Sequence, residues 1–158
     1  MNTKDRTLVV GLDAACWEYL TPLLQDGCLP HLARLIGQGV HGSLRSTMPP
    51  ITPAAWSSLV TGVNPGKHGV MGWVRRPPDD YRFIPVNGDD RVGTPVWQRL
   101  NAAGIRVGVA NIPLTYPVRP LDGFLLCGFG TPTSARDLTH PPDLLSAIEA
   151  RFGLYQPT

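Results

Sequence analysis

The chain of 158 residues lacks the features that would tie it to a membrane or to nucleic acid. Its formal net charge is only +2, which is too small to attract nucleic acid or an anionic lipid surface. It also has no long hydrophobic run. The polar N-terminus leads into an apolar segment that is too short for a signal-peptide core or a membrane span. We therefore expect neither a membrane segment nor a nucleic-acid partner.

Cysteine is scarce as well. The three cysteines, Cys16, Cys28 and Cys127, are far apart in the sequence and form neither a CxxC pair nor a zinc-binding pattern. The simplest interpretation is three reduced, buried thiols in a cytoplasmic protein.

Glycine and proline, in contrast, are plentiful, with 17 of each. No repeat or biased run accompanies them, so they indicate many ordered turns rather than low complexity. Hydrophobic residues make up 42% of the sequence, and its length is sufficient for one domain with a core.

Apolar runs alternate with helical patterns along the chain. This order is typical of an α/β fold with a mainly parallel sheet and helices on both faces. We predict strands at residues 7–12, 39–47, 105–111 and 123–129, and a further short strand can be placed at 81–86. We predict helices at 21–37 (broken near Gly27 and Pro30), 54–60, 94–104 and 141–153.

Residues 48–62 are the segment around which the chain is organised. Thr52 is a favourable helix N-cap, and Pro53 then occupies the first helical position. The Thr52 hydroxyl would lie at the positive end of a helix dipole, which binds phosphate and favours an alkoxide. The simpler interpretation is that Thr52 only caps the helix.

Asp13 directly follows the first predicted strand. If the strands at 7–12 and 39–47 are parallel, Asp13 and Thr52 lie at the same edge of the sheet, where open α/β folds bind ligands. Asp13 could instead be a turn or cap residue before the next helix.

Three segments together resemble the alkaline phosphatase superfamily, and most closely its type I phosphodiesterases and nucleotide pyrophosphatases. They are residues 11–14 (GLDA), 52–62 (TPAAWSSLVTG) and 65–70 (PGKHGV). Residues 107–117 and 127–132 resemble the predicted phosphohydrolase and phosphomutase subgroup of that branch. The resemblance implies that residues 1–158 are the N-terminal part of an alkaline phosphatase-like catalytic domain.

This resemblance implies that Asp13 is a metal ligand and that Thr52 is both the nucleophile and a metal ligand. The metals would be two divalent cations, usually Zn²⁺. A threonine hydroxyl is a poor nucleophile near neutral pH, so it needs a nearby cation to lower its pKa. The implied reaction is hydrolysis, or intramolecular transfer, of a phosphomonoester or phosphodiester through a phosphothreonine intermediate.

The sequence departs from the family pattern at two kinds of position. Many nucleotide pyrophosphatases carry an asparagine three residues after the nucleophile, where this chain has Ala55. This difference argues against a straightforward nucleotide pyrophosphatase. Asn111 could line the substrate pocket instead, or it could cap its own loop. A sulfatase is disfavoured because the sequence after Thr52 lacks the pattern that formylglycine formation requires.

The remaining metal ligands of the family are absent from the matched region. His68 is expected to make a structural hydrogen bond, and the segment 137–140 is expected to form a capped surface turn. Arg75 and Arg76 could meet a phosphate, or they could belong to a solvated loop.

Asp13 and Thr52 alone would leave two metals under-coordinated. We therefore expect an N-terminal piece of a longer enzyme whose C-terminal remainder supplies the other ligands. The alternatives are a non-catalytic phosphate-binding or interaction fragment, and an unstable fragment whose strand edges lack partners.

Overall fold

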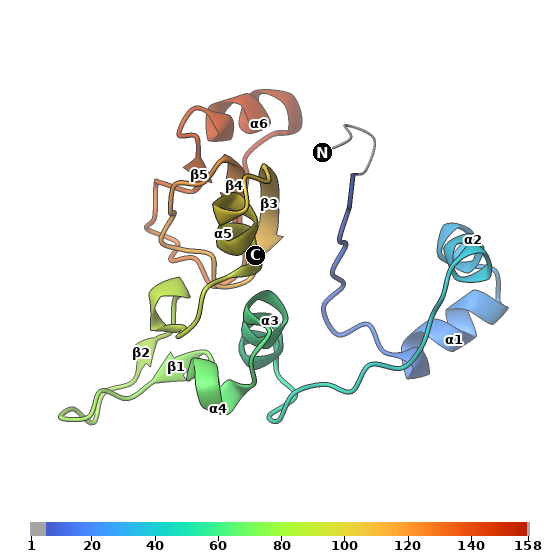
Figure 1. Cartoon of the computed structure of the whole chain (residues 1–158), viewed down its shortest axis with the longest axis horizontal. Helices are drawn as coiled ribbons and strands as arrows, with labels where there is room; N and C mark the ends of the chain where they lie inside the picture. The colour runs from blue at the N-terminus through green and yellow to red at the C-terminus, as the bar shows by residue number, and fades with distance from the viewer. Residues whose placement is uncertain (1–5, 158) are drawn as a thin grey trace. The chain divides into compact units, whose positions relative to one another are not determined.

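The computed structural model describes residues 6–157. The chain divides into two compact units, one ending at Arg45 and the other beginning at Ser46. Figure 1 labels the helices and strands of both.

The first unit contains the helices α1 (Trp17–Gln25) and α2 (Pro30–Gln38), which pack against each other. The predicted break between them is confirmed. Gly27 adopts a left-handed conformation with φ of 71°, and Pro30 occupies the first turn of α2, where its missing N–H has no cost.

The two strands predicted in the first unit are wrong. Residues 6–12 and 40–47 have no regular secondary structure, and neither segment is part of a β-ladder among the described residues. The apolar side chains of the first segment are largely exposed, from 61% for Leu12 to 86% for Leu8. An apolar pattern favours a strand, but a strand also requires a neighbour that pairs with its backbone.

The second unit contains most of the regular structure. Its helices are α3 (Thr52–Thr61), α4 (Pro65–His68), α5 (Val96–Ala102) and α6 (Leu144–Phe152), with a short 3₁₀-helix η1 (Gly88–Asp90). Its strands are β1 (Val74–Arg75), β2 (Ile84–Pro85), β3 (Val107–Ile112), β4 (Gly123–Cys127) and β5 (Thr139–His140).

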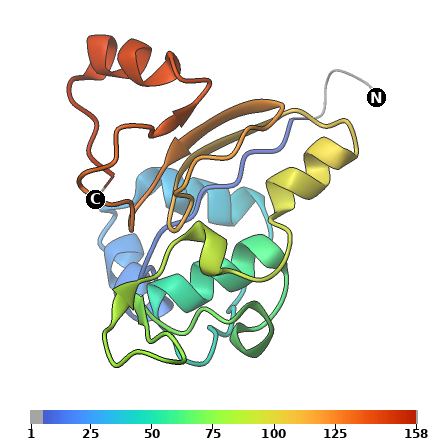
Figure 2. The same cartoon turned by 90° about the vertical axis from the view of Figure 1, so that its left-hand side faces the viewer.

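The strands form two small sheets. β1 pairs antiparallel with β2, whereas β4 lies between β3, which is parallel to it, and β5, which is antiparallel. Figure 2 shows the second sheet from the side, and α6 contacts its short strand β5. The α/β class is confirmed. The mainly parallel sheet with helices on both faces is not, because β3–β4 is the one parallel pairing in the part of the chain that the structure describes.

The main core of the second unit joins α3, α5 and the sheet. It consists of Val60, Trp97, Val109, Leu125 and Cys127, each no more than 9% exposed. A smaller cluster contains Val70, Val86 and Leu114. Burial of these side chains fixes α3 against the strands, since their apolar surface is removed from water together.

The prediction of buried thiols is confirmed only for Cys127. Burial raises the pKa of this thiol to about 11, so it is an inert core residue rather than a nucleophile. Cys28 is exposed and Cys16 is half-buried, and all three thiols are free. No helix within residues 6–157 has the length and apolar character needed to cross a bilayer.

Candidate active site

Thr52 is the first residue of α3. The N-cap is Ile51, one residue earlier than predicted, and its carbonyl accepts the Ala55 N–H at 2.9 Å. The predicted location of Thr52 at a helix N-terminus is therefore confirmed, within the usual uncertainty of one residue. Its side chain is half-buried. The positive end of the helix dipole lies at this turn, which favours an anion or a developing alkoxide there.

The helix that carries Thr52 is held firmly. Pro53, Ala54, Trp56 and Ser57 follow Thr52 and are all buried, and Val60 enters the main core. At the other end, Gly62 has a left-handed conformation with φ of 73°, and its N–H donates to the Ser58 carbonyl at 2.8 Å. A left-handed glycine satisfies a carbonyl that the helix leaves open. The start of α3 thus has a fixed position within the second unit.

His68 joins α4 to α3 and is fully buried. The Val70 N–H donates to His68 Nδ1 at 3.1 Å, so Nε2 carries the proton and donates to Ser58 Oγ at 2.9 Å. Burial lowers the pKa of His68, with the nearby Ala54 carbonyl acting in the opposite direction and the Arg91 charge lowering it further. His68 is therefore a neutral structural residue, and the expectation of a structural hydrogen bond is confirmed.

Asp13 lies in an exposed turn before α1, next to Ala14, which has φ of 57°. It does not end a strand, because residues 6–12 form no strand within the part of the chain that the structure describes. This location agrees with the alternative interpretation of a turn residue. Asp13 belongs to the first unit and Thr52 to the second, so their predicted meeting at one sheet edge stays a prediction.

Asn111 is an exposed residue where the register of β3 against β4 shifts, and it has φ of 55°. Asparagine tolerates this left-handed conformation better than most residues. Tyr155 O–H donates to the Cys127 carbonyl at 2.6 Å and lies 3.1 Å from Asn111 Oδ1. Burial is the main cause that raises the pKa of Tyr155. The contact orients the Asn111 amide; its role toward a substrate stays a prediction.

Other polar residues singled out in the sequence make local contacts. Arg75 forms an ion pair with Asp90, and the Arg76 guanidinium lies 5.4 Å from the centre of the Tyr81 ring. The segment predicted as a surface turn at 137–140 is instead partly a strand. Thr139 and His140 form β5 and pair with β4, a long-range contact that a local turn pattern does not reveal.

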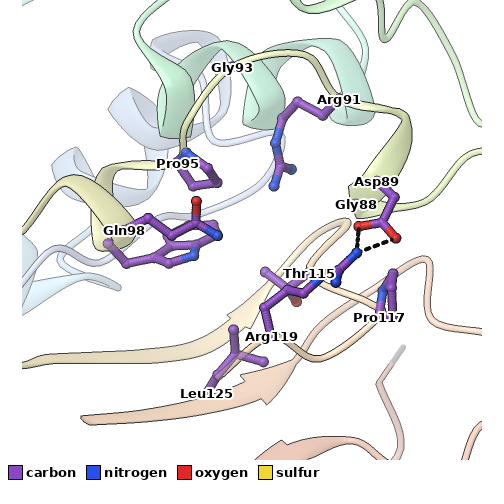
Figure 3. A pocket seen from close by; sticks show the side chains of 11 residues that line it. Gly88, Asp89, Arg91, Gly93, Pro95, Gln98, Thr115, Pro117, Arg119 and Leu125 are labelled. Carbon is purple, nitrogen blue, oxygen red and sulfur yellow. Dashed lines mark hydrogen bonds and ion pairs between the residues drawn. The ribbon is translucent and has the colours of Figure 1, made fainter. Parts of the chain in front are cut away.

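One polar pocket escaped the sequence analysis. Arg91 and Arg119 line a cavity in the second unit together with Asp89 (Figure 3). Arg91 and Arg119 are single arginines in separate loops, so no motif or spacing marks them. The charged run GDDR at 88–91 is the one local feature that could have indicated a polar pocket, and the same pattern is equally typical of a turn.

The described residues do not complete a metal site of the kind the resemblance implies. Between residues 6 and 157 there is no group of three or more His, Cys, Asp or Glu side chains that could hold an ion. A catalytic zinc site normally has three protein ligands. Asp13 and Thr52 thus remain proposed ligands only.

Comparisons with known proteins give one result. No curated protein and no solved structure matches the chain. The family model described as type I phosphodiesterase / nucleotide pyrophosphatase matches residues 7–153, which include Asp13, Thr52 and Asn111. Because the match covers nearly all of the sequence, the chain belongs to the type I phosphodiesterase/nucleotide pyrophosphatase family of the alkaline phosphatase superfamily.

Proposed function

We propose that the chain contributes to hydrolysis of a phosphomonoester or phosphodiester through a phosphothreonine intermediate on Thr52. Membership of the family suggests phosphoester hydrolysis. The observation that carries the assignment to Thr52 is its location in the first turn of α3, a helix start fixed by the buried residues that follow it. A hydroxyl at this position meets the anionic phosphoryl group at the favourable end of the helix dipole.

The proposed reaction has two displacements at phosphorus. Thr52 Oγ loses its proton to water or a base and forms the new P–O bond, while the bond from phosphorus to the leaving oxygen breaks and that oxygen takes up a proton. Water then attacks the phosphothreonine, releases Thr52 and gives inorganic phosphate from a monoester or a phosphomonoester from a diester. In a mutase, a hydroxyl of the substrate would replace this water.

We also propose that Asp13 and Thr52 are ligands of two Zn²⁺ ions. The side chains within 6–157 do not suffice for such a site, so further ligands from outside this range belong to the proposal. Of the two ligands, Asp13 has the more suitable chemistry, because a carboxylate binds Zn²⁺ without first losing a hydroxyl proton.

The test uses the protein expressed from its full reading frame, with Zn²⁺ added. Hydrolysis of p-nitrophenyl phosphate and of bis-p-nitrophenyl phosphate would be measured for wild type, Thr52→Ala and Thr52→Ser. We expect Thr52→Ala to lower kcat by roughly a thousandfold or more, because it removes the nucleophile. Thr52→Ser keeps a hydroxyl at the helix start and should retain a measurable part of the activity. Acid quenching during turnover should trap phosphate on Thr52.

Equal activity of wild type and Thr52→Ala would rule out Thr52 as the nucleophile.

A second candidate function, phosphate binding without turnover, is motivated by the incomplete ligand set of the described residues. It predicts that wild type with Zn²⁺ binds phosphate and hydrolyses neither substrate.

A further inference from the structure

The second unit contains a cavity of about 190 Å³ that the proposed reaction does not use (Figure 3). Its volume corresponds to about six water molecules at ~30 Å³ each, which is small for a nucleotide but sufficient for one compact anionic group. Gly93 lines the cavity and lies next to Thr61, at the C-terminal end of α3. Thr52 is at the other end of this helix, about 14 Å away along its axis.

Arg91 is directed into the cavity (Figure 3). Its Nη1 donates to the Leu114 carbonyl at 3.2 Å, and its guanidinium carbon lies 5.9 Å from the centre of the Trp97 ring. Its Nε is buried and has no hydrogen-bond partner among the residues described. A guanidinium has five N–H donors, so most of the donor capacity of Arg91 is uncommitted.

The charge of Arg91 is also uncompensated at close range. None of the ion pairs found within residues 6–157 includes it. Burial lowers the pKa of Arg91, and Asp89 acts in the opposite direction. A partly buried cation without a paired anion destabilises the fold, and a bound anion would offset that cost.

Arg119 lies on the opposite wall of the cavity beside Asp89 (Figure 3). Its Nη2 contacts both oxygens of the Asp89 carboxylate, at 2.8 and 2.9 Å. These three side chains therefore carry a net charge of +1. Because Asp89 contacts Arg119 and not Arg91, the excess positive charge lies at Arg91.

The remaining walls favour a bound anion over a solvated one. Trp97 and Leu125 are buried apolar residues, and Pro95 and Pro117 add further apolar surface. Where these apolar side chains exclude water, the attraction between a guanidinium and an oxyanion is stronger than in open solvent. Gln98 also lines the cavity, and in the described part of the chain its side-chain amide makes no hydrogen bond that would compete for a ligand.

We propose that this cavity is a binding site for one small oxyanion, a carboxylate or a phosphate group, held by the Arg91 guanidinium with Gln98 and Arg119 as neighbouring donors. The planar guanidinium fork matches both groups through two parallel hydrogen bonds. The site is separate from Thr52 and does not depend on the proposed reaction.

The test is an NMR titration of the full chain, labelled with ¹⁵N, at low ionic strength. Inorganic phosphate and acetate are added in separate experiments, and the arginine Nε–H signals are followed. We expect the Arg91 Nε–H signal to shift and saturate with at least one of the two anions. The anion that binds more tightly identifies the oxyanion group. If neither anion saturates the signal, the proposal is wrong.

Variants locate the site. In the variants, binding is followed through the Nε–H signal of Arg119, which also lines the cavity, because Arg91→Gln lacks the Arg91 signal. Arg91→Gln should weaken binding roughly tenfold to a hundredfold, because it removes the charged donor. Arg106→Gln is the matched control, since Arg106 is an exposed arginine paired with Asp122 and should leave binding unchanged. Asp89→Asn removes the competing carboxylate and should tighten binding several-fold. A purely structural role of Arg91 predicts no such gain.

Thr52→Ala separates this site from the proposed catalytic one. Binding that persists in Thr52→Ala and weakens in Arg91→Gln supports the cavity, whether or not Thr52 proves to be a nucleophile. Binding lost in Thr52→Ala and kept in Arg91→Gln would place the anion elsewhere and overturn the proposal.

Discussion

Each unit of the chain contains an apolar segment with a sequence pattern typical of a β-strand. The segment forms a buried strand in the second unit but not in the first. Residues 7–12 read TLVVGL, and β3 at 107–112 reads VGVANI. In the second unit β3 pairs with β4, and Val109 is only 5% exposed. In the first unit no ladder forms among the described residues, and Val9 and Val10 are 78% and 70% exposed.

This contrast shows that an apolar run does not by itself determine whether a segment is buried. It expresses a preference for extended backbone, but burial depends on other segments that pair with it and cover it. β3 has β4 as its neighbour, and Val60 of α3 and Trp97 of α5 cover its inward face. Residues 7–12 have the same preference, but no other described segment of the first unit pairs with them in a β-ladder.

Truncating one leucine in each unit should give the largest difference in stability between them. Leu125→Ala removes a side chain that is 2% exposed and should lower the free energy of unfolding by about 3 kcal/mol. Leu8→Ala removes a side chain that is 86% exposed and should change it by less than about 0.5 kcal/mol. Urea unfolding measures both. Equal losses of unfolding free energy in the two variants would show that residues 7–12 are buried in solution. The difference in burial between the two segments would then be wrong.

A pair of glycines tests the same contrast through backbone spacing. A Cβ at Gly128 would lie 2.5 Å from the Asn111 carbonyl carbon and the Ile112 oxygen, so Gly128→Ala must displace backbone. We expect a loss of about 1–3 kcal/mol in unfolding free energy. Gly42 in the first unit has open space around it, and Gly42→Ala should be neutral or stabilising by up to about 1 kcal/mol. Thermal unfolding measures the stability of both variants. A loss of stability in Gly42→Ala as large as that in Gly128→Ala would contradict the structure.

A smaller effect distinguishes the buried His68 from the exposed His31. The pKa of His68 is lower in the folded protein than its ordinary value of 6.5, so the unfolded chain binds the proton first. The free energy of unfolding should therefore fall as the pH drops below about 7, by at most about 1.4 kcal/mol per pH unit. The slope ends once the pH is below the folded pKa.

The control for this slope is a matched pair of variants. His68→Gln should remove the part of the slope due to His68, whereas His31→Gln should leave it unchanged. Denaturant unfolding at several pH values between 5 and 8 measures the slope. An unchanged slope in His68→Gln would show that other groups cause it.

Local features of the fold were predictable from the sequence. The Thr-Pro start and the glycine stop of α3 act within one turn of the helix, and they placed Thr52 at its N-terminus correctly. The helix predicted at 94–104 is α5, whose last turn runs into the left-handed Gly104. The short helix α4 was not predicted. The Asn64 side chain accepts the Lys67 N–H at 3.1 Å and caps its start.

Long-range features were not predictable in the same way. The Tyr155 hydroxyl reaches Asn111 and Cys127 from a distant part of the sequence, so no spacing rule anticipates it. The same holds for the cavity around Arg91, whose walls come from η1, α5 and the loop after β3. The sequence thus indicated the helix that carries Thr52, but not the side chains that surround Asn111 or Arg91.

The main core also determines the order in which the second unit can fold. β3 and β4 are joined by the short loop 113–122, so their pairing closes a small loop at low entropic cost. Val60, in contrast, enters the same cluster as Leu125 only after a much longer stretch of chain has been closed. We therefore expect the sheet to form before α3 docks on it, so the helix start that holds Thr52 acquires its final position late in folding.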